Sequence, residues 1–261
     1  MTPEISIVVP LRDEEPSVTL LHAELSAVMP RTGRAWELIL VDDGSVDGTL
    51  AAAEAVQARD PRVRVVSFDR NYGQTAAFAA GFARARGGLV VTLDGDLQND
   101  PADIPRLVDL ASRFDVVCGW RRQRQDAFLT RSVPSTVANW LLGLVSGVRI
   151  HDNGCSLKVF RTEFVRPLAL RPGMHRFLPA LASARGARIA EVVVGHRPRR
   201  FGRSKYGLSR TFRVLADLVR LRGLMRRAAR EAHALPEPWY HVARERGAGV
   251  PDGAAGVERL G

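Results

Sequence analysis

The segment from Leu89 to Gln98 carries the residue pattern best suited to chemistry. Its apolar run ends at Leu93, and two carboxylates follow at once, Asp94 and Asp96, with one glycine between them. At the carboxyl end of a buried strand, these side chains place hard oxygen ligands where open α/β folds bind their substrates. Oxygen ligands favour Mg²⁺ or Mn²⁺, which also bind substrate phosphates, and Gln98 is a candidate third ligand. A local explanation stays open, because aspartate is also favoured in helix caps and turns.

A second acidic pair, Asp42 and Asp43, follows another apolar run and precedes Gly44. Carboxylates accept hydrogen bonds from the N–H groups of a base and from ribose hydroxyls, so this pair is a candidate nucleoside site. The Asp-Gly step is also common in turns, and both explanations remain open. Glu14 is open in the same way, since a carboxylate at the start of a helix interacts favourably with its dipole.

Arginines suited to phosphate binding follow the acidic segments. Arg70 lies after a third apolar run, and the loop 121–131 contains Arg121, Arg122, Arg124 and Arg131. Because arginine binds phosphate through two parallel hydrogen bonds, this loop is a candidate site for a second, phosphate-bearing substrate. A solvated loop explains the same pattern. Further along, Gly202 and Ser204 indicate a tight loop that presents Arg203 and Lys205 to an anion.

The elements that position these residues alternate along the chain. Strands are predicted at 5–9, where Pro10 is expected to end the strand, and at 36–41, 63–68, 89–93 and 116–119. Helices are predicted between them, at 17–29, 47–57, 75–86 and 101–112. Alternation with short loops predicts an α/β fold with a mostly parallel, doubly wound sheet. The polar residues that follow the first four strands should therefore meet at one edge of the sheet.

The pattern changes after Arg121. Short strands are predicted at 157–160 and 191–195, and an amphipathic basic helix at 210–230. From 231 to 261 the chain is rich in Gly, Ala, Pro and charged residues, which predicts a disordered tail.

Composition narrows the class of protein. The chain has 261 residues, a net charge of +10 and two cysteines without metal-ligand spacing, which argues against a zinc or disulfide scaffold. Residues 197–230 contain 12 Arg or Lys and one acid, which suits an anionic membrane surface, a nucleic acid or a merely solvated face. No apolar run of membrane-spanning length and no signal peptide are predicted.

Several motifs together resemble those of family 2 glycosyltransferases, specifically the polyprenyl-phosphate hexosyltransferases. The matching segments are Ile7–Pro10, Val41–Ser45, Arg70–Gln74, Thr92–Gln98, Val117–Arg121 and Phe201–Tyr206. The resemblance implies a GT-A fold, an inverting mechanism and a divalent metal, Mg²⁺ or Mn²⁺. Residues 1–209 would then form the catalytic domain, followed by the basic helix and the tail.

The resemblance also implies roles for individual residues. Four would hold the nucleotide: Pro10, Glu14, Asp42 and Asp43. Asp94, Asp96 and Gln98 would hold the metal and the diphosphate, with Asp152 near the reaction centre. Arg121 and Arg131 would bind the lipid phosphate, and the loop of Arg203, Ser204 and Lys205 would close over the site.

The leading hypothesis is a glycosyltransferase that moves a hexose from a UDP- or GDP-sugar to a polyprenyl phosphate. Many members of this family carry membrane helices after the basic segment. Because none is predicted here, we expect a cytoplasmic protein, peripheral at the inner face of the cell membrane or recruited by a membrane partner. One alternative is a soluble family 2 transferase with a saccharide or small-molecule acceptor. Another is a basic nucleic-acid-binding protein, which the lack of interleaved aromatics and recognition motifs disfavours.

Overall fold

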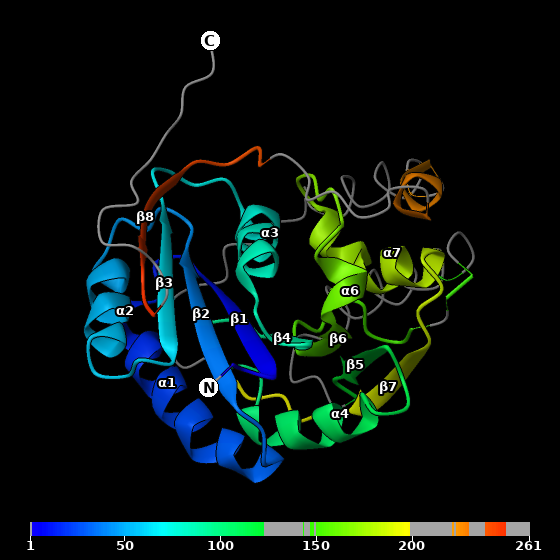
Figure 1. The fold of residues 1–261 in the computed structure, drawn as a ribbon, viewed down its shortest axis with the longest axis horizontal. Helices are drawn as coiled ribbons and strands as arrows, with labels where there is room; N and C mark the ends of the chain where they lie inside the picture. Colours follow the sequence, from blue (N-terminus) through cyan, green and yellow to red (C-terminus); the bar gives the residue numbers. More distant parts are fainter. Residues whose placement is uncertain are drawn as a thin grey trace.

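A computed structural model describes residues 2–122, 143, 147–148, 150–198, 221, 223–229 and 238–248. In this part of the chain an eight-stranded sheet has the order β7-β5-β6-β4-β1-β2-β3-β8, and helices cover both of its faces (Figure 1). The strands are β1 (Ile5–Leu11), β2 (Trp36–Asp42), β3 (Val63–Phe68), β4 (Leu89–Thr92), β5 (Val116–Trp120), β6 (Lys158–Arg161), β7 (Ile189–Val193) and β8 (Val242–Arg246). The α-helices are α1 (Glu15–Val28), α2 (Thr49–Gln57), α3 (Gln74–Arg84), α4 (Ile104–Leu110), α6 (Thr162–Val165) and α7 (Leu178–Ala184). Shorter 3₁₀ turns are η1 (Met29–Thr32), η2 (Pro101–Asp103) and η4 (Met174–Phe177).

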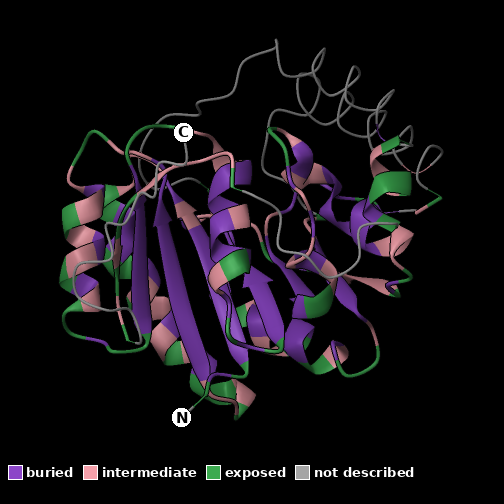
Figure 2. Cartoon of the chain, turned by 45° about the horizontal axis from the view of Figure 1, so that its top comes forward, coloured by how far each residue is buried: buried purple, intermediate pink, exposed green. Residues whose placement is uncertain are grey.

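The centre of the sheet confirms the predicted parallel arrangement. Strands β4, β1, β2 and β3 are neighbours and run parallel, and Figure 2 shows them buried along their length. Alternate residues of β1 face opposite layers: Val8 packs in the cluster that contains α3, while Ile7 packs with α1 and α4. Burial on both faces explains why these strands read as continuous apolar runs.

Antiparallel pairing extends the sheet beyond this core. Strand β6 lies between β4 and β5 and is antiparallel to both, while β5 and β7 are parallel to each other. The sheet is therefore mixed but mainly parallel, as expected. Pairing of β6 with β4 places Lys158 opposite Thr92, next to the segment that carries Asp94.

The expectation that Pro10 ends the first strand is wrong, because β1 continues to Leu11. Its pairing with β4 ends at Val8 and Thr92, whereas its pairing with β2 continues to Leu11. Val8 accepts a hydrogen bond from Leu93 N (3.2 Å), and Pro10, two residues on, faces the same side of the strand. Since β4 has already ended there, the missing N–H of proline costs no ladder bond.

The prediction of a disordered tail from residue 231 is also wrong in part. Residues 238–248 are described and include β8, which pairs antiparallel with β3 at the edge of the sheet. Glu245 forms ion pairs with Arg64 (3.0 Å) and Arg84 (2.8 Å), and Trp239 donates a hydrogen bond to the Leu170 carbonyl (2.6 Å). The sequence did not indicate this strand because edge strands often carry charged residues, and β8 therefore lacks an apolar run. The rest of the predicted tail lies outside the described residues.

The basic helix predicted at 210–230 is described only in part. Of the basic helix predicted at 210–230, residues 221 and 223–229 are described, and they are helical. Among the described residues, no helix combines the length and the apolar character needed to cross a bilayer.

Candidate active site

The loops after β1 and β2 are tied together by hydrogen bonds. Arg12 donates to the backbone carbonyls of Asp43 (2.7 Å) and Gly44. At the start of α1, Glu14 N donates to Thr49 Oγ1 (2.8 Å), and Glu15 accepts a hydrogen bond from Gly48 N (3.0 Å). Glu14 is therefore the residue that immediately precedes α1, and it lies beside the loop that follows β2. These contacts show that the loops after β1 and β2 meet at one edge of the sheet.

Asp43 organises the third loop. Its carboxylate accepts hydrogen bonds from Asn71 Nδ2 (2.8 Å), Tyr72 N (2.7 Å) and Gly73 N (2.9 Å). Burial raises the pKa of Asp43, and the two backbone N–H donors and Arg12 act in the opposite direction. The same carboxylate thus holds the loop that follows β3, in agreement with the turn explanation left open by the sequence. Its assignment to the nucleotide stays a prediction.

The neighbouring residues pack closely around this loop. Asp42 is buried and accepts hydrogen bonds from Ser67 Oγ (3.1 Å) and Ser45 N (3.2 Å). Gly44 has φ +63°, and a Cβ there would lie 2.4 Å from the backbone carbonyl carbon of Arg70, so only glycine fits. The Arg70 guanidinium lies 5.0 Å from the centre of the Tyr72 ring. The second and third loops therefore form one packed unit.

The two candidate metal ligands lie close together after β4. Asp94 accepts a hydrogen bond from Gln74 Nε2 (2.7 Å), and Asp96 from Gln98 N (3.2 Å). Burial raises the pKa of Asp94, and the charge of Asp96 adds to this effect. A cation between the two carboxylates would relieve that repulsion, so the pair suits a divalent metal. No three His, Cys, Asp or Glu side chains gather to hold a metal alone in the described residues.

Arg121, which is half-buried, and the buried Asp152 form an ion pair next to this acidic pair. Asp152 accepts hydrogen bonds from Arg121 Nε (2.7 Å) and Nη2 (3.0 Å), one to each oxygen. Burial opposes the charged form of Arg121, but the hydrogen bonds and charge of Asp152 outweigh it and raise the pKa of Arg121. The charge of Arg121 also acts on Asp94. A permanent cation thus lies beside the candidate metal site.

Three further residues surround Asp94 that sequence reasoning did not single out. Gln74 begins α3, Ser156 forms a hydrogen bond with Asp94, and the charge of buried Lys158 partly opposes the rise that burial causes in the pKa of Asp94. Lys158 Nζ donates to the carbonyls of Asn153 (3.2 Å) and Cys155. Gln74 follows the glycine of the third loop, so its place was readable from the sequence. Lys158 had a signal too, because a lysine inside a predicted apolar strand is unusual.

The structure places the other predicted residues as follows. Pro10 lies in β1 opposite Val41 of β2. The loop that begins at Asn99 is fastened from the far side, because Arg197 N donates to Gln98 O (2.8 Å) and Asn99 Nδ2 donates to Ser156 Oγ (2.7 Å). Arg131, Arg203, Ser204 and Lys205 lie outside the described residues, and their roles stay predictions.

Known proteins resemble this chain in sequence and in fold. The family model described as glycosyl transferase family 2 matches residues 6–167. The chain is 47% identical to a dodecaprenyl-phosphate galacturonate synthase of Rhizobium johnstonii, over 88% of this chain and 70% of that protein. It is 41% identical to an undecaprenyl-phosphate 4-deoxy-4-formamido-L-arabinose transferase of Pseudomonas aeruginosa, over 82% of this chain and 64% of that protein.

Solved structures show the same architecture at lower identity. A glucosyl-3-phosphoglycerate synthase of Mycobacterium tuberculosis, crystallised with Mn²⁺ and UDP-glucose, matches with a TM-score of 0.65 at 22% identity, over 85% of this chain and 79% of that one. A mannosyl-3-phosphoglycerate synthase of Rubrobacter xylanophilus matches with a TM-score of 0.64 at 19% identity, over 91% and 78%. These likenesses concern the fold. The family model and the 47% identical relative establish that the chain belongs to glycosyl transferase family 2.

Proposed function

We propose that this enzyme transfers a sugar from a nucleoside diphosphate to a polyprenyl phosphate. The observation that carries the proposal is the meeting of the Asp94–Asp96 pair with the Arg121–Asp152 ion pair at one sheet edge. An acidic pair suits a metal-bound diphosphate, and a half-buried arginine suits a second phosphate. The names of the two relatives above, both of which act on polyprenyl phosphates, support the choice of acceptor.

The donor half of the site contains Asp94 and Asp96. These two carboxylates would hold Mg²⁺ or Mn²⁺, with Gln98, water and diphosphate oxygens as the remaining ligands. Bound there, the metal would neutralise charge that develops on the departing diphosphate. Gln74 keeps Asp94 oriented through its hydrogen bond of 2.7 Å. The loop held by Asp43 would carry the nucleoside, with Arg70 near the phosphates.

The acceptor half centres on Arg121. Asp152 engages Nε and Nη2 of this guanidinium, so we assign Asp152 as the positioning residue and Nη1 of Arg121 as the contact with the lipid phosphate. A phosphate monoester is largely ionised at neutral pH, since its second pKa is about 6, and it needs no strong general base. Its oxygen attacks the anomeric carbon, the bond from that carbon to the diphosphate oxygen breaks, and the nucleoside diphosphate leaves with inversion.

The membrane contact is part of the proposal. The polyprenyl acceptor is a membrane lipid, and the basic segment 197–230 contains 12 Arg or Lys. We infer that this segment holds the enzyme at the inner face of the cell membrane, where anionic lipids attract basic helices.

Thermal stabilisation by nucleotides tests the donor half without needing the acceptor. UDP and GDP are screened with Mn²⁺ or Mg²⁺ against wild type, Asp96→Asn and the control Asp109→Asn, whose carboxylate is exposed on α4. A ligand at 100 times its Kd stabilises the folded state by about 2.7 kcal/mol. We expect metal-dependent stabilisation in wild type and Asp109→Asn, and its loss in Asp96→Asn. Equal stabilisation of all three proteins would contradict the metal assignment.

A further inference from the structure

The segment 72–75 connects the two acidic parts of the candidate site. Its first two backbone N–H groups donate hydrogen bonds to Asp43 (2.7 and 2.9 Å). Its third residue, Gln74, donates from Nε2 to Asp94 (2.7 Å). Because both carboxylates bind the same short segment, any shift of the segment moves the loop proposed to carry the nucleoside relative to the proposed metal ligand.

Aromatic rings from the C-terminal part of the chain pack against the start of the segment 72–75. The ring of Trp239 lies edge-on to that of Tyr72, with 6.5 Å between their centres. Tyr72 also packs on Phe68 (5.7 Å), and Phe68 packs on Tyr240 (5.0 Å). Aromatic contacts of this geometry stabilise beyond the area that they bury. The two C-terminal rings lie just before β8 and pack against the core cluster that contains α3 (Figure 1).

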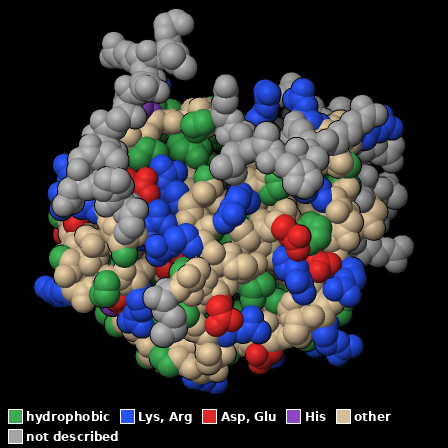
Figure 3. Space-filling model, viewed as in Figure 1, with side chains coloured by type: hydrophobic (Ala, Val, Ile, Leu, Met, Phe, Trp, Pro, Cys, Tyr) green, Lys and Arg blue, Asp and Glu red, His purple; other side chains and the backbone are tan. Residues whose placement is uncertain are grey.

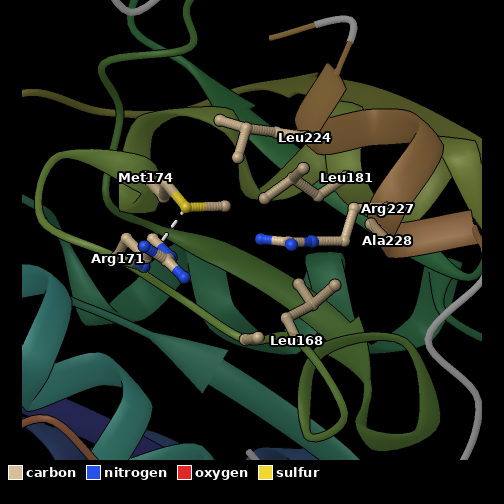
Figure 4. Close-up of a pocket in the computed structure, with 8 residues that line it drawn as sticks. Leu168, Arg171, Met174, Leu181, Leu224, Arg227 and Ala228 are labelled. Carbon is tan, nitrogen blue, oxygen red and sulfur yellow. Dashed lines mark hydrogen bonds between the residues drawn. The ribbon is translucent and has the colours of Figure 1, made fainter. Parts of the chain in front are cut away.

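Trp239 also binds a loop on the other side of α3. Its indole Nε1 donates a hydrogen bond to the carbonyl of Leu170 (2.6 Å), which belongs to the loop 168–175. Leu170 and Met174 of this loop are buried. Figure 4 shows a further bond within it, from Arg171 N to Met174 Sδ (3.2 Å). The indole is therefore attached to a loop with a defined conformation.

The loop 168–175 returns to the end of the segment 72–75. Thr75 Oγ1 accepts a hydrogen bond from Gly173 N (3.0 Å), and the same oxygen forms another with His175 Nδ1 (2.7 Å). Thr75 is buried, which shields these bonds from water. The indole therefore contacts the start of the segment directly and its end through this loop.

The strand β8 fastens these aromatic residues to the domain. It pairs antiparallel with β3, and Glu245 forms ion pairs with Arg64 (3.0 Å) and Arg84 (2.8 Å). The side chains of Glu245 and Arg64 are 15% and 9% exposed, so this pair is less screened by water than a surface pair. Arg84 is the last residue of α3, so β8 binds this helix at the end opposite to the segment 72–75.

We propose that Trp239 is a positioning residue that fixes the segment 72–75 and thereby sets the affinity for the nucleoside diphosphate. It acts through Tyr72 and Leu170. The identity of the ligand rests on the proposed function. A merely structural role would reduce the fraction of folded protein, which lowers activity but leaves the Kd for the nucleotide unchanged. Loss of positioning raises that Kd, because the loop and the metal ligand no longer share one fixed arrangement.

Amide hydrogen exchange of the ligand-free full chain tests the positioning itself. Trp239→Leu removes the ring contact and the indole N–H, whereas Trp239→Phe keeps a ring and loses the N–H. In the peptide that contains residues 72 and 73, we expect Trp239→Leu to exchange at least about tenfold faster than wild type, the combined effect of an aromatic pair and a hydrogen bond. Trp239→Phe should lie between the two.

Two control variants separate this effect from general destabilisation. Arg244→Gln changes an exposed residue of β8 that pairs with Glu54 (2.8 Å). Ile5→Val removes a methyl group at the start of β1, in the core cluster on the other face of the sheet, and lowers stability there. Both controls should exchange like wild type in the peptide that contains residues 72 and 73.

Titration calorimetry with UDP or GDP and Mn²⁺ tests the consequence for the ligand. For the nucleotide that binds wild type, we expect Trp239→Leu to raise the Kd at least about tenfold, in line with the exchange result. Trp239→Phe should restore part of the affinity, and both controls should keep the wild-type Kd. Thermal unfolding of each variant shows whether the fold is retained.

Faster exchange together with a raised Kd supports the inference. It is overturned if Trp239→Leu exchanges like the controls, or if its stability falls while its Kd equals that of wild type. If neither nucleotide binds wild type, the proposed function fails, and the exchange result alone decides whether Trp239 positions the segment. If Trp239→Leu does not fold, Trp239→Phe decides by the same two measurements.

Discussion

Asp43 is buried and Asp94 is half-buried, and the pKa of each is raised, yet their partners differ. Asp43 is surrounded by N–H donors of the loop that follows β3. Asp94 faces another carboxylate, Asp96, together with a glutamine and nearby cations. The first environment holds a loop in place, and the second gains from an added cation. Residue type alone does not distinguish the two, because in both cases aspartate follows a buried strand.

Asp43→Asn tests the loop-holding role. The amide nitrogen would face an N–H donor in place of one carboxylate oxygen, leaving a donor unpaired, which costs about 1–3 kcal/mol. Urea unfolding should show this loss, whereas the exposed control Asp109→Asn should stay within about 0.5 kcal/mol of wild type. If both variants unfold alike, the Asp43 carboxylate does not hold the loop.

Asp60 provides a test by pH. Its hydrogen bonds with Arg62 (2.9 and 2.8 Å) and with His22 (2.8 Å) lower the pKa of Asp60 below its ordinary value of about 3.9. A lowered pKa in the folded state means that this carboxylate stabilises the fold above about pH 4 and that the stabilisation disappears as the pH falls toward the folded pKa.

The difference in unfolding free energy between wild type and Asp60→Asn should therefore be full at pH 7, about 1–3 kcal/mol for a charged hydrogen-bond network. It should shrink as the pH is lowered below 4. A difference that is constant from pH 7 to pH 3 would show that the charge of Asp60 does not contribute.

At the scale of elements, close packing of α3 against β1 positions Gln74 beside Asp94. The helix is rich in alanine and contains Gly81, where an added Cβ would lie 2.2 Å from Val8 Cγ1. Helix propensity alone would favour Gly81→Ala by up to about 1 kcal/mol, but the clash with a fully buried strand residue is the larger effect.

We expect Gly81→Ala to lower the free energy of unfolding by about 1–3 kcal/mol, the usual cost of overpacking. Gly88→Ala is the matched control, since nothing lies within 4 Å of a Cβ there, and it should change stability little. Chemical denaturation of the two variants decides the matter; a more stable Gly81→Ala protein would mean that α3 can shift away from β1.

The sequence predicted the local elements better than their pairing. The apolar runs of β1 to β5 are bounded by turn residues, so the first half of the sheet and the edge at which its polar loops meet could be predicted. The antiparallel placement of β6 could not, because a short strand carries no sign of its direction. The strand β8 was missed since its residues are mostly charged, and its stability comes from ion pairs such as Glu245–Arg84 (2.8 Å) that exist only in the fold.

For the candidate site, too, local features could be predicted from the sequence and long-range contacts could not. Asp94 and Asp96 could be predicted as a pair because they lie two residues apart in sequence. The hydrogen bonds between Asp152 and Arg121 join residues that are 31 positions apart in the sequence. Lys158 lies near Asp94 because β6 pairs antiparallel with β4. These contacts depend on topology, which spacing in the sequence does not encode.

At the scale of the whole molecule, the excess positive charge is concentrated in one segment of the chain, 197–230. Figure 3 shows Lys and Arg side chains spread over the face in view, several of them beside acidic groups. In the described part of the chain, Arg64, Arg84 and Arg86 form ion pairs with Glu245 or Glu37. The basic segment 197–230, with 12 Arg or Lys and one acid, accounts for the net charge of +10. In the function proposed above, the α/β domain would hold the transfer site and the basic segment would be attracted to an anionic surface.

Direct measurement of product tests the central claim. The enzyme is incubated with radiolabelled UDP- or GDP-sugars, Mn²⁺ and polyprenyl phosphate in vesicles, and the lipid fraction is analysed for a sugar attached through a single phosphate. We expect label in the lipid with one donor, dependence on both metal and acceptor, and loss of transfer by at least about 100-fold in Asp96→Asn, as for removal of a key electrostatic group, but not in Asp109→Asn. Unlabelled lipid with every donor, or equal transfer by Asp96→Asn and wild type, would contradict the account.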